Sequence, residues 1–340
     1  MSMPISIPEE LEGVQGEIAR ALDLVAARFE EQLVCDLPAV GELCAHVERY
    51  RGKMLRPTLV LASGLAACED AEIGEAHVVL SAVVEMVHMA TLVHDDVLDD
   101  AAMRRGAPTV GRLRGNEAAV ILGDYLIASA FHLCSQLESQ RASLLVGRAS
   151  MTVAQGELLQ LHNRDNFSLD ERTYLEILER KTAALIAIAC ELGAWASGAG
   201  EEVCRSMALF GREIGVAFQI QDDLLDLTGT EGVVGKSLGL DVANGKLTLS
   251  LIHYLESAEA NDRGRALELI ESIASNGVDG STTESAELLE ILEASGSIEH
   301  ARATARARIE RAKRHVRAAP GLPARAFLEA IADEVIVRRR

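Results

Sequence analysis

The sequence has 340 residues, of which 49% are hydrophobic and 3% are aromatic. That length accommodates one large domain or two ordinary ones, and the hydrophobic fraction is sufficient for a folded globular core. With 33 basic and 52 acidic residues, the formal net charge of -19 opposes association with nucleic acid or anionic membrane surfaces. An anionic ligand would therefore need locally placed Lys and Arg residues, or metal ions held by some of the acidic residues.

The cysteines and the N-terminal segment bear on the cellular compartment. Six cysteines are scattered through apolar helical patterns without a CxxC pair or zinc-type spacing, and they are interpreted as small buried side chains in a reducing compartment. The first 20 residues lack a basic segment followed by an apolar one, and no stretch has the roughly 18 uncharged apolar residues of a spanning helix. We therefore expect a cytoplasmic protein without a transmembrane segment.

The pattern along the chain is helical. Seven prolines, abundant Ala, Leu and Glu, and few strand-like alternations predict an all-α protein. Residues 76–100 form one long pattern that is apolar nearly all round, as is typical of a central helix in a bundle. Residues 207–227 repeat this pattern. Each stretch ends in an acidic DDxxD box, Asp95 to Asp99 and Asp222 to Asp226, and a glycine-rich segment follows the second box.

Weaker signals mark the rest of the chain. Ser168 and Glu171 have capping-box spacing and predict the start of a helix. After a break near residue 277, shorter and more charged helices are expected at about 284–295 and 297–317. No long linker and no repeat of 20 to 50 residues separates independent domains, so residues 1–340 are predicted to form a single domain.

The two acidic boxes have a spacing that suits a metal site. On a helix, Asp95 and Asp99 project from one face while Asp96 lies about 100° round, and Asp222 and Asp226 repeat this geometry. Like charges at that spacing repel, so several carboxylates in an apolar environment require a compensating cation. Hard oxygen ligands suit magnesium, which takes its remaining ligands from water and substrate phosphates. The alternative for one box alone is an acidic turn at a solvated helix end.

Basic side chains are concentrated around the boxes, where they could bind a diphosphate that magnesium alone would leave exposed. The candidates are Lys53 and Arg56 at the start of a helix, Arg104 and Arg105 one or two helical turns beyond Asp99, Lys181 beside Thr182 on the helix that opens near Ser168, and Lys236 and Lys246 in the glycine-rich segment. Taken singly, each is more often a solvated surface charge.

Seven segments, in order along the chain, contain most of these residues. They are RGKMLRP (51–57), HMATLVHDDVLDDAAMRRGAPT (88–109), GDYL (123–126), GELLQL (156–161), ERKTAAL (179–185), FQIQDDLLD (218–226) and GKSLGLDVANGKLTL (235–249). Together they resemble the trans-type polyprenyl diphosphate synthases, relatives of farnesyl diphosphate synthase. The resemblance covers nearly the whole chain and implies the isoprenoid synthase fold, a single-domain helical bundle around a large central cavity.

The resemblance also implies a role for each candidate residue. The implied catalytic residues are Asp95, Asp96, Asp99, Lys181, Asp222, Asp223 and Asp226. Among them, Asp95, Asp99 and Asp222 resemble ligands of three magnesium ions, while Asp223 and Asp226 would act through water or other side chains. Contacts to the allylic diphosphate are implied for Arg104, Lys181, Thr182, Gln219, Lys236 and Lys246, and contacts to isopentenyl diphosphate for Lys53, Arg56, His88 and Arg105. The alternative for His88 is a core histidine with a satisfied hydrogen bond.

Arg51 and the C-terminal arginines need separate interpretation. The anion loop of the family usually has two glycines before its lysine, and Arg51 replaces the first of them. Because Gly52, Lys53 and Arg56 remain, we expect altered loop geometry and retained binding. Arg338, Arg339 and Arg340 at the C-terminus are interpreted as a frayed basic tail, although they could fold over isopentenyl diphosphate.

The implied reaction is a head-to-tail condensation in which an allylic diphosphate ionises, isopentenyl diphosphate attacks the cation, and a proton is lost. In the family, bulky aromatic residues four or five positions before the first box stop elongation early. Those positions hold Thr91 and Ala90, which leave room for a long product, hexaprenyl to decaprenyl. Another helix, such as the one with Phe131, or a partner subunit could instead close the pocket.

Other functions remain open at this point. A short-chain synthase making farnesyl or geranylgeranyl diphosphate, or a non-catalytic subunit of a heteromeric synthase, would share the fold. A terpene cyclase is disfavoured because the second box keeps the synthase form, and a helical scaffold would not explain the basic residues. The resemblance implies a homodimer, and product release could involve peripheral contact with a membrane.

Overall fold

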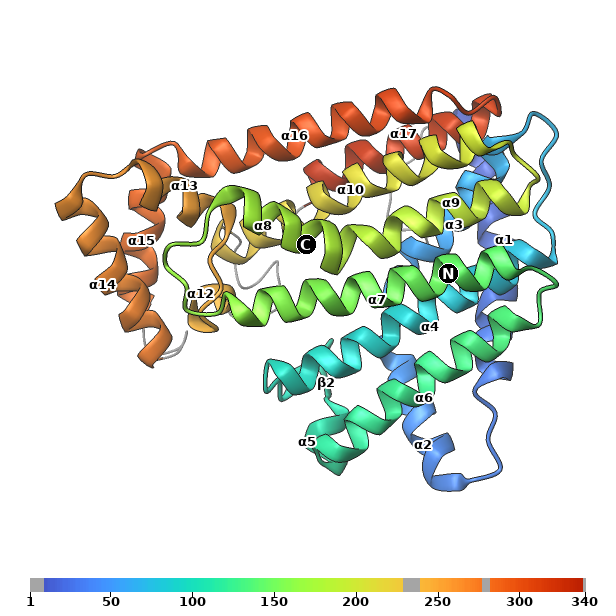
Figure 1. The fold of residues 1–340 in the computed structure, drawn as a ribbon, viewed down its shortest axis with the longest axis horizontal. Coiled ribbons are helices and arrows are strands. Elements are labelled where there is room, and N and C mark those ends of the chain that lie inside the picture. The colour runs from blue at the N-terminus through green and yellow to red at the C-terminus, as the bar shows by residue number, and fades with distance from the viewer. Residues whose placement is uncertain (1–8, 229–238, 277–281, 339–340) are drawn as a thin grey trace. The chain divides into compact units, whose positions relative to one another are not determined.

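The computed structural model describes residues 9–228, 239–276 and 282–338 (Figure 1). These residues form helices and one short strand pair, so the predicted all-α class is confirmed. They are organised in two compact units. Unit 1 comprises Met1–Met151, Leu185–Gly211 and His315–Ile331, and unit 2 comprises Thr152–Ala184, Arg212–Arg314 and Ala332–Arg340.

Unit 1 is built around one apolar helix, α4 (Glu75–Leu98), which packs against α1, α3 and α6 (Figure 1). Its elements are η1 (Glu9–Leu11), α1 (Glu12–Gln32), α2 (Pro38–Val47), η2 (Glu48–Tyr50), α3 (Leu55–Ala67), α4, β1 (Met103–Arg104), β2 (Ala107–Pro108), α5 (Val110–Arg114) and α6 (Asn116–Ser135), with parts of α7 (Gln140–His162), α9 (Ala184–Ala196), α10 (Glu201–Thr228), α16 (Ser297–Val316) and α17 (Leu322–Val337).

The central helix ends earlier than its apolar pattern suggests. The amide of Asp99 donates to the carbonyl of Asp95 at 2.9 Å, and Asp100 then adopts a left-handed conformation with φ of 47°. A helix cannot continue through such a residue. Arg104 and Arg105 were expected on a further helical turn; instead Arg104 lies in the antiparallel pair β1–β2, and Arg105 occupies the turn that joins the two strands.

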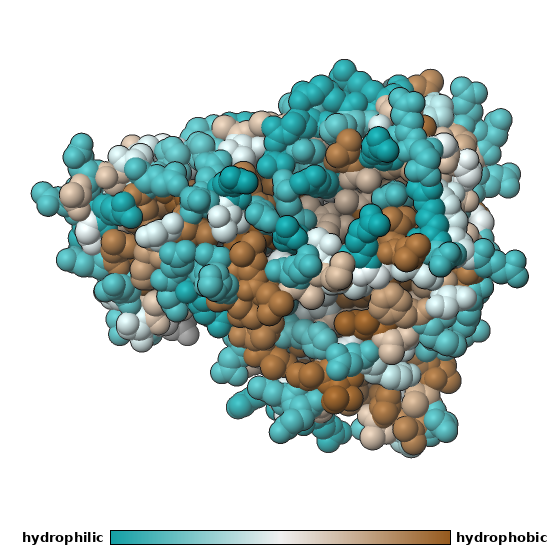
Figure 2. Space-filling view, in the orientation of Figure 1, coloured by the Kyte–Doolittle hydropathy of each residue, from teal (hydrophilic) through white to brown (hydrophobic). Residues whose placement is uncertain are grey.

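Two helices of unit 1 are long and apolar enough to cross a membrane by length and composition alone, α4 and α6. The apolar window of α4 is 78% buried inside the protein, as in the core helix of a soluble protein, whereas that of α6 is 44% buried. Exposed apolar side chains include Ile121 of α6 and Leu144 of α7, and Figure 2 shows apolar patches on one face. Burial, rather than composition, therefore argues against a spanning role for α4.

Unit 2 contains the residues on either side of the second box. Its elements are α8 (Glu171–Leu178), the π-helical turn η3 (Glu179–Ala183), α12 (Leu240–Ala243), α13 (Leu249–Ser257), α14 (Ala260–Asn276) and α15 (Thr282–Ala294), with the remaining parts of α7, α10, α16 and α17. The two charged helices predicted near the C-terminus correspond to α15 and α16. The predicted cap of α8 is wrong by two residues, because Asp170, not Ser168, accepts from the amide of Thr173 at 2.7 Å.

Two glycines bring α3 and α9 into close contact within unit 1. A Cβ atom at Gly193 would overlap the carbonyl oxygen of Val60, and one at Gly64 would lie 2.5 Å from Nε2 of His77. That imidazole also forms a hydrogen bond of 2.9 Å with Ser197, whose hydroxyl donates to the carbonyl of Gly64 at 2.8 Å. A side chain at Gly193 would therefore separate α3 from α9, whereas one at Gly64 would displace the imidazole of His77.

We expect Gly193→Ala to destabilise the protein by about 1–3 kcal/mol, because the added methyl group must displace backbone atoms of α3. Urea denaturation followed by circular dichroism measures the change. Gly13→Ala in α1 is the control, since a Cβ at that position meets nothing within 4 Å. An unchanged midpoint for Gly193→Ala would contradict the close packing of α3 and α9.

Candidate active site

The first acidic box, at the end of α4, contains two kinds of aspartate. Asp95 and Asp99 are partly exposed, whereas Asp96 is only 4% exposed. Arg104 donates from Nε to the Asp96 carboxylate at 2.6 Å. Burial raises the pKa of Asp96, and the charge of Arg104 opposes that rise. Asp96 therefore anchors Arg104 at the end of α4, while Asp95 and Asp99 remain accessible to a ligand.

The predicted anion loop lies before α3, as expected. Met54 adopts a left-handed conformation with φ of 54°, so Lys53 and Arg56 lie on either side of the start of the helix. Arg105 reaches this loop and donates from Nη1 to the carbonyl of Tyr50 at 2.6 Å. A Cβ atom at Gly52 would lie 2.7 Å from Cζ of Arg105. The absence of a side chain at position 52 is therefore what allows the guanidinium to lie against the loop backbone.

Arg51, the departure from the family pattern, points away from this contact. Its Nη1 lies 3.2 Å from a carboxylate oxygen of Glu30, and its guanidinium carbon lies 4.3 Å from the ring centroid of Phe29. Both partners belong to α1. The larger residue at this position is thus accommodated by packing on α1, and Gly52 retains its contact with Arg105.

The helix α4 presents two ionisable side chains near this loop, Glu85 and His88. Glu85, only 2% exposed, has a pKa raised by burial, against which the charges of Arg56 and Arg105 act. One turn later, burial and the charges of Arg56 and Arg105 hold the pKa of His88 well below its usual value. His88 is therefore neutral beside the arginines, and three of the four residues predicted for isopentenyl diphosphate share one electrostatic environment. Sequence reasoning missed Glu85, although an acidic residue in an apolar helix was a visible signal.

The two positions predicted to control chain length, Ala90 and Thr91, lie on α4 between His88 and the first box. Ala90 is fully buried, and the hydroxyl of Thr91 donates to the carbonyl of His88 at 2.7 Å. Met86 and Val87, one turn earlier on α4, are also buried. This part of α4 carries no aromatic side chain.

The second box, at the end of α10, also contains both partly exposed and buried aspartates. The Asp222 side chain is 42% exposed and forms an ion pair with Arg338. The Asp226 carboxylate is buried, and it accepts from the amide of Asp241 at 3.0 Å. Its backbone carbonyl accepts from the amide of Gly239 at 2.9 Å. Asp226 therefore holds the segment that follows the glycine-rich stretch.

Arg338 is not a frayed tail residue, and Arg339 and Arg340 lie outside the described residues. Besides pairing with Asp222, its guanidinium lies over the Phe218 ring, with Cζ 3.8 Å from the centroid, and donates to the Phe218 carbonyl at 3.3 Å. The expectation of a disengaged basic tail is wrong at this residue, because an aromatic face and a carboxylate one helical turn apart on α10 together bind a guanidinium.

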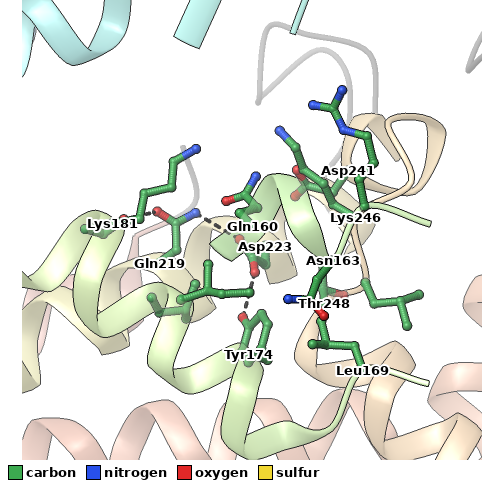
Figure 3. A pocket seen from close by; sticks show the side chains of 15 residues that line it. Gln160, Asn163, Leu169, Tyr174, Lys181, Gln219, Asp223, Asp241, Lys246 and Thr248 are labelled. Carbon is green, nitrogen blue, oxygen red and sulfur yellow. Dashed lines mark hydrogen bonds between the residues drawn. The ribbon is translucent and has the colours of Figure 1, made fainter. Parts of the chain in front are cut away.

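The middle carboxylate of the second box is satisfied by two side chains (Figure 3). Asp223 accepts from the hydroxyl of Tyr174 at 2.6 Å and from Nε2 of Gln219 at 2.9 Å. Thr182 in turn donates to Oε1 of Gln219 at 3.0 Å. Burial, together with the charge of Asp241, raises the pKa of Asp223 well above its usual value. Two residues predicted to contact a diphosphate, Gln219 and Thr182, are thus bonded to each other.

A pocket of about 110 Å³ in unit 2 collects most of these side chains. It is lined by Gln160, Asn163, Arg164, Leu169, Tyr174, Ile177, Leu178, Lys181, Thr182, Gln219, Asp223, Asp241, Lys246, Leu247 and Thr248. In Figure 3, Lys181 and Lys246 extend toward the side of the pocket away from Tyr174. Lys181 pairs with Glu157 of α7. Sequence reasoning missed Tyr174 and Asp241, and Lys236 lies outside the described residues.

The accessible aspartates fit magnesium. Within residues 9–228, 239–276 and 282–338, no group of three or more His, Cys, Asp or Glu side chains is close enough to hold an ion unaided. Magnesium does not need such a group, because it binds through one or two carboxylates and completes its shell with waters and substrate phosphates. Asp95, Asp99 and Asp222 offer partly exposed oxygen ligands of this kind, whereas Asp96, Asp223 and Asp226 are buried.

Comparison with known proteins agrees with this chemistry. Residues 38–284 match the family model described as polyprenyl synthetase. Heptaprenyl diphosphate synthase component 2 of Bacillus subtilis (strain 168) is 34% identical over 319 residues, or 94% of this chain and 88% of that protein. Octaprenyl diphosphate synthase of Escherichia coli (strain K12) is 32% identical over 339 residues, or 97% and 99%. The crystal structure of a decaprenyl diphosphate synthase from Rhodobacter capsulatus matches with a TM-score of 0.88 at 33% identity, covering 97% and 99%. The chain therefore belongs to the polyprenyl synthetase family and is a polyprenyl diphosphate synthase.

Proposed function

We propose that this enzyme condenses isopentenyl diphosphate head-to-tail with an allylic diphosphate to make a long-chain polyprenyl diphosphate, hexaprenyl to decaprenyl. One observation carries the proposal: in both boxes the accessible carboxylates are those that the resemblance assigns to metal, while the other carboxylates anchor neighbouring side chains or backbone. The long-chain names of the relatives and the small residues before the first box support the product class.

In the allylic half, Asp95, Asp99 and Asp222 would hold magnesium, three ions in all. Bound magnesium neutralises the diphosphate and stabilises it as a leaving group. Lys181, Lys246, Lys236 and Arg104 would contact the same group and oppose its developing charge. Ligand binding at Asp222 requires Arg338 to give up its ion pair, and binding at Lys181 requires the same of Glu157.

In the isopentenyl half, Lys53, Arg56 and Arg105 supply positive charge and His88 supplies a neutral imidazole donor. Gly52 supports this assignment, because it lets Arg105 lie against the loop that carries Lys53. Glu85, buried near Arg56 and Arg105, limits the mutual repulsion of the arginines before substrate binds.

The enzyme would act as a single polyprenyl synthase domain and as a homodimer in the cytoplasm. The exposed apolar residues Val120 and Ile121 on α6 support a subunit contact, and product release could involve a membrane surface. The name of the Bacillus subtilis relative, component 2, raises a second candidate: the chain works only with a second type of subunit. The complete aspartate boxes favour activity of the chain alone.

Incubation of the purified chain with isopentenyl diphosphate, magnesium and geranyl, farnesyl or geranylgeranyl diphosphate tests the proposal. We expect products of six to ten isoprene units by mass spectrometry, abolished by EDTA and restored by added magnesium. Farnesyl or geranylgeranyl diphosphate as the sole product would establish the short-chain alternative. No turnover of any starter by the correctly folded chain would indicate a subunit of a heteromeric synthase.

Replacement of Ala90 by Phe should shorten the product by several isoprene units, because the ring would occupy space below the first box. The product distribution by mass spectrometry measures the change, and Ala90→Leu should give an intermediate length. Thr91→Val, which alters volume little, is the control. An unchanged distribution in a folded Ala90→Phe enzyme would show that the growing chain does not pass Ala90.

Replacement of Gly52 by Ala should raise KM for isopentenyl diphosphate about tenfold and leave KM for the allylic substrate within about twofold. The added methyl group would displace the Arg105 guanidinium, the flexible end of a side chain, so the melting temperature should change little. Gly41→Ala in α2, where a Cβ meets nothing within 4 Å, is the control. Equal effects on both KM values would contradict the assignment of Arg105 to the isopentenyl site.

A further inference from the structure

A chain of hydrogen bonds in unit 2 connects three helical segments. It begins at the Tyr174 hydroxyl on α8, passes through the Asp223 carboxylate and the Gln219 amide on α10, and ends at the Thr182 hydroxyl in η3. The bond lengths are 2.6, 2.9 and 3.0 Å in that order. Figure 3 shows these bonds along one wall of the pocket.

The amide of Gln219 orders the donors and acceptors of this chain. Its nitrogen can only donate to Asp223, and Asp223 as a carboxylate also accepts from the Tyr174 hydroxyl. The Gln219 oxygen is then directed toward Thr182 and accepts its hydroxyl proton. Since Thr182 has a single hydroxyl proton, it cannot donate that proton to a diphosphate at the same time. Of the residues in this turn, Lys181 is therefore the one that remains to contact the diphosphate.

Tyr174 is the fixed end of the chain. It is 3% exposed and belongs to an apolar cluster that includes Leu178, Ile220 and Leu249. At the other end, η3 is a π-helical turn, a geometry that is rare and frequently found at functional sites. Gly156 of α7 lets this turn approach closely, since a Cβ there would lie 2.5 Å from the amide of Lys181.

We propose that Tyr174 is a positioning residue for the allylic half of the site, acting through Asp223 and Gln219 on the turn that carries Lys181. The inference rests on the proposed role of Lys181 toward the allylic diphosphate. Without the Tyr174 hydroxyl, Asp223 is a buried carboxylate with one donor fewer, and it can rotate away from Gln219. The side-chain amide of Gln219 can then rotate and exchange its oxygen and nitrogen positions, so that η3 loses the acceptor that orients Thr182.

The test is Tyr174→Phe in the full-length enzyme. We expect kcat to fall about 10- to 100-fold, the effect of losing one hydrogen bond to a charged group, and KM for the allylic substrate to rise about fivefold. KM for isopentenyl diphosphate should stay within about twofold. Tyr254→Phe is the matched control, because Tyr254 lies in the same apolar cluster and its hydroxyl makes no hydrogen bond within the part of the chain that the structure describes. It should leave all three parameters unchanged.

Gln219→Met interrupts the chain away from the apolar cluster and should reproduce the Tyr174→Phe parameters. In the Asp223→Asn background, Tyr174→Phe should cause almost no further loss, because both changes break the same chain. Unchanged kinetics in Tyr174→Phe, additive losses in the double variant, or equal increases in both KM values would overturn the inference while the wild type remained active. Failure of the proposed function would appear differently, as a wild-type enzyme that turns over no starter.

Discussion

A carboxylate buried among helices must have hydrogen-bond donors or it loses the solvation that makes it stable as an anion. This constraint divides the six aspartates of the two boxes. Asp96 accepts a hydrogen bond from Arg104. Asp223 accepts from Tyr174 and Gln219, and Asp226 accepts from the amide of Asp241. The remaining three are partly exposed. The same short motif thus supplies both ligand candidates and the structural bonds that hold the ends of α4 and α10 in shape.

The constraint also explains how an acidic protein can present cations to an anionic substrate. Lys181 is paired with Glu157, Arg338 with Asp222, and Arg104 with Asp96. Each pairing neutralises a basic group that would otherwise repel its neighbours, so the basic sets can be assembled before any diphosphate binds. A diphosphate with bound cations carries both signs of charge. Its phosphate oxygens can take the place of the acidic partner beside a Lys or Arg, and its cations can take the place of the basic partner beside an Asp.

The amino-acid sequence predicts the helical class, the long apolar helices and the boxes at their ends, because these depend on periodicity that is read locally. It also predicts Lys53 and Arg56 at the start of α3. It misplaces Arg104 and Arg105, because the left-handed Asp100 ends α4 two residues before the apolar pattern stops. Whether the helices enclose the expected central cavity stays a prediction.

Other residues could not be predicted because their role depends on partners distant in the sequence. Tyr174 in an apolar helical pattern resembles any core tyrosine, and only the proximity of Asp223, 49 residues later, makes its hydroxyl a donor to the second box. Arg338 lies 116 residues from Asp222. Gln219 and Thr182 were identified from the family motif, but their bond to each other requires the fold.

The π-helical turn η3 has a consequence for how the chain tolerates insertions and deletions. A π-turn closes its hydrogen bonds over one residue more than an α-turn, so loss of one residue from Glu179–Ala183 would restore α-helical bonding. Because the π-turn accommodates that extra residue, its loss would leave α8 facing the same way and Tyr174 beside Asp223, whereas Lys181 and Thr182 within the turn would change their facing. A homologue with an unbroken α-helix here would differ from this chain by a single-residue gap, and would keep the tyrosine donor of its second box while presenting the residues of this turn differently.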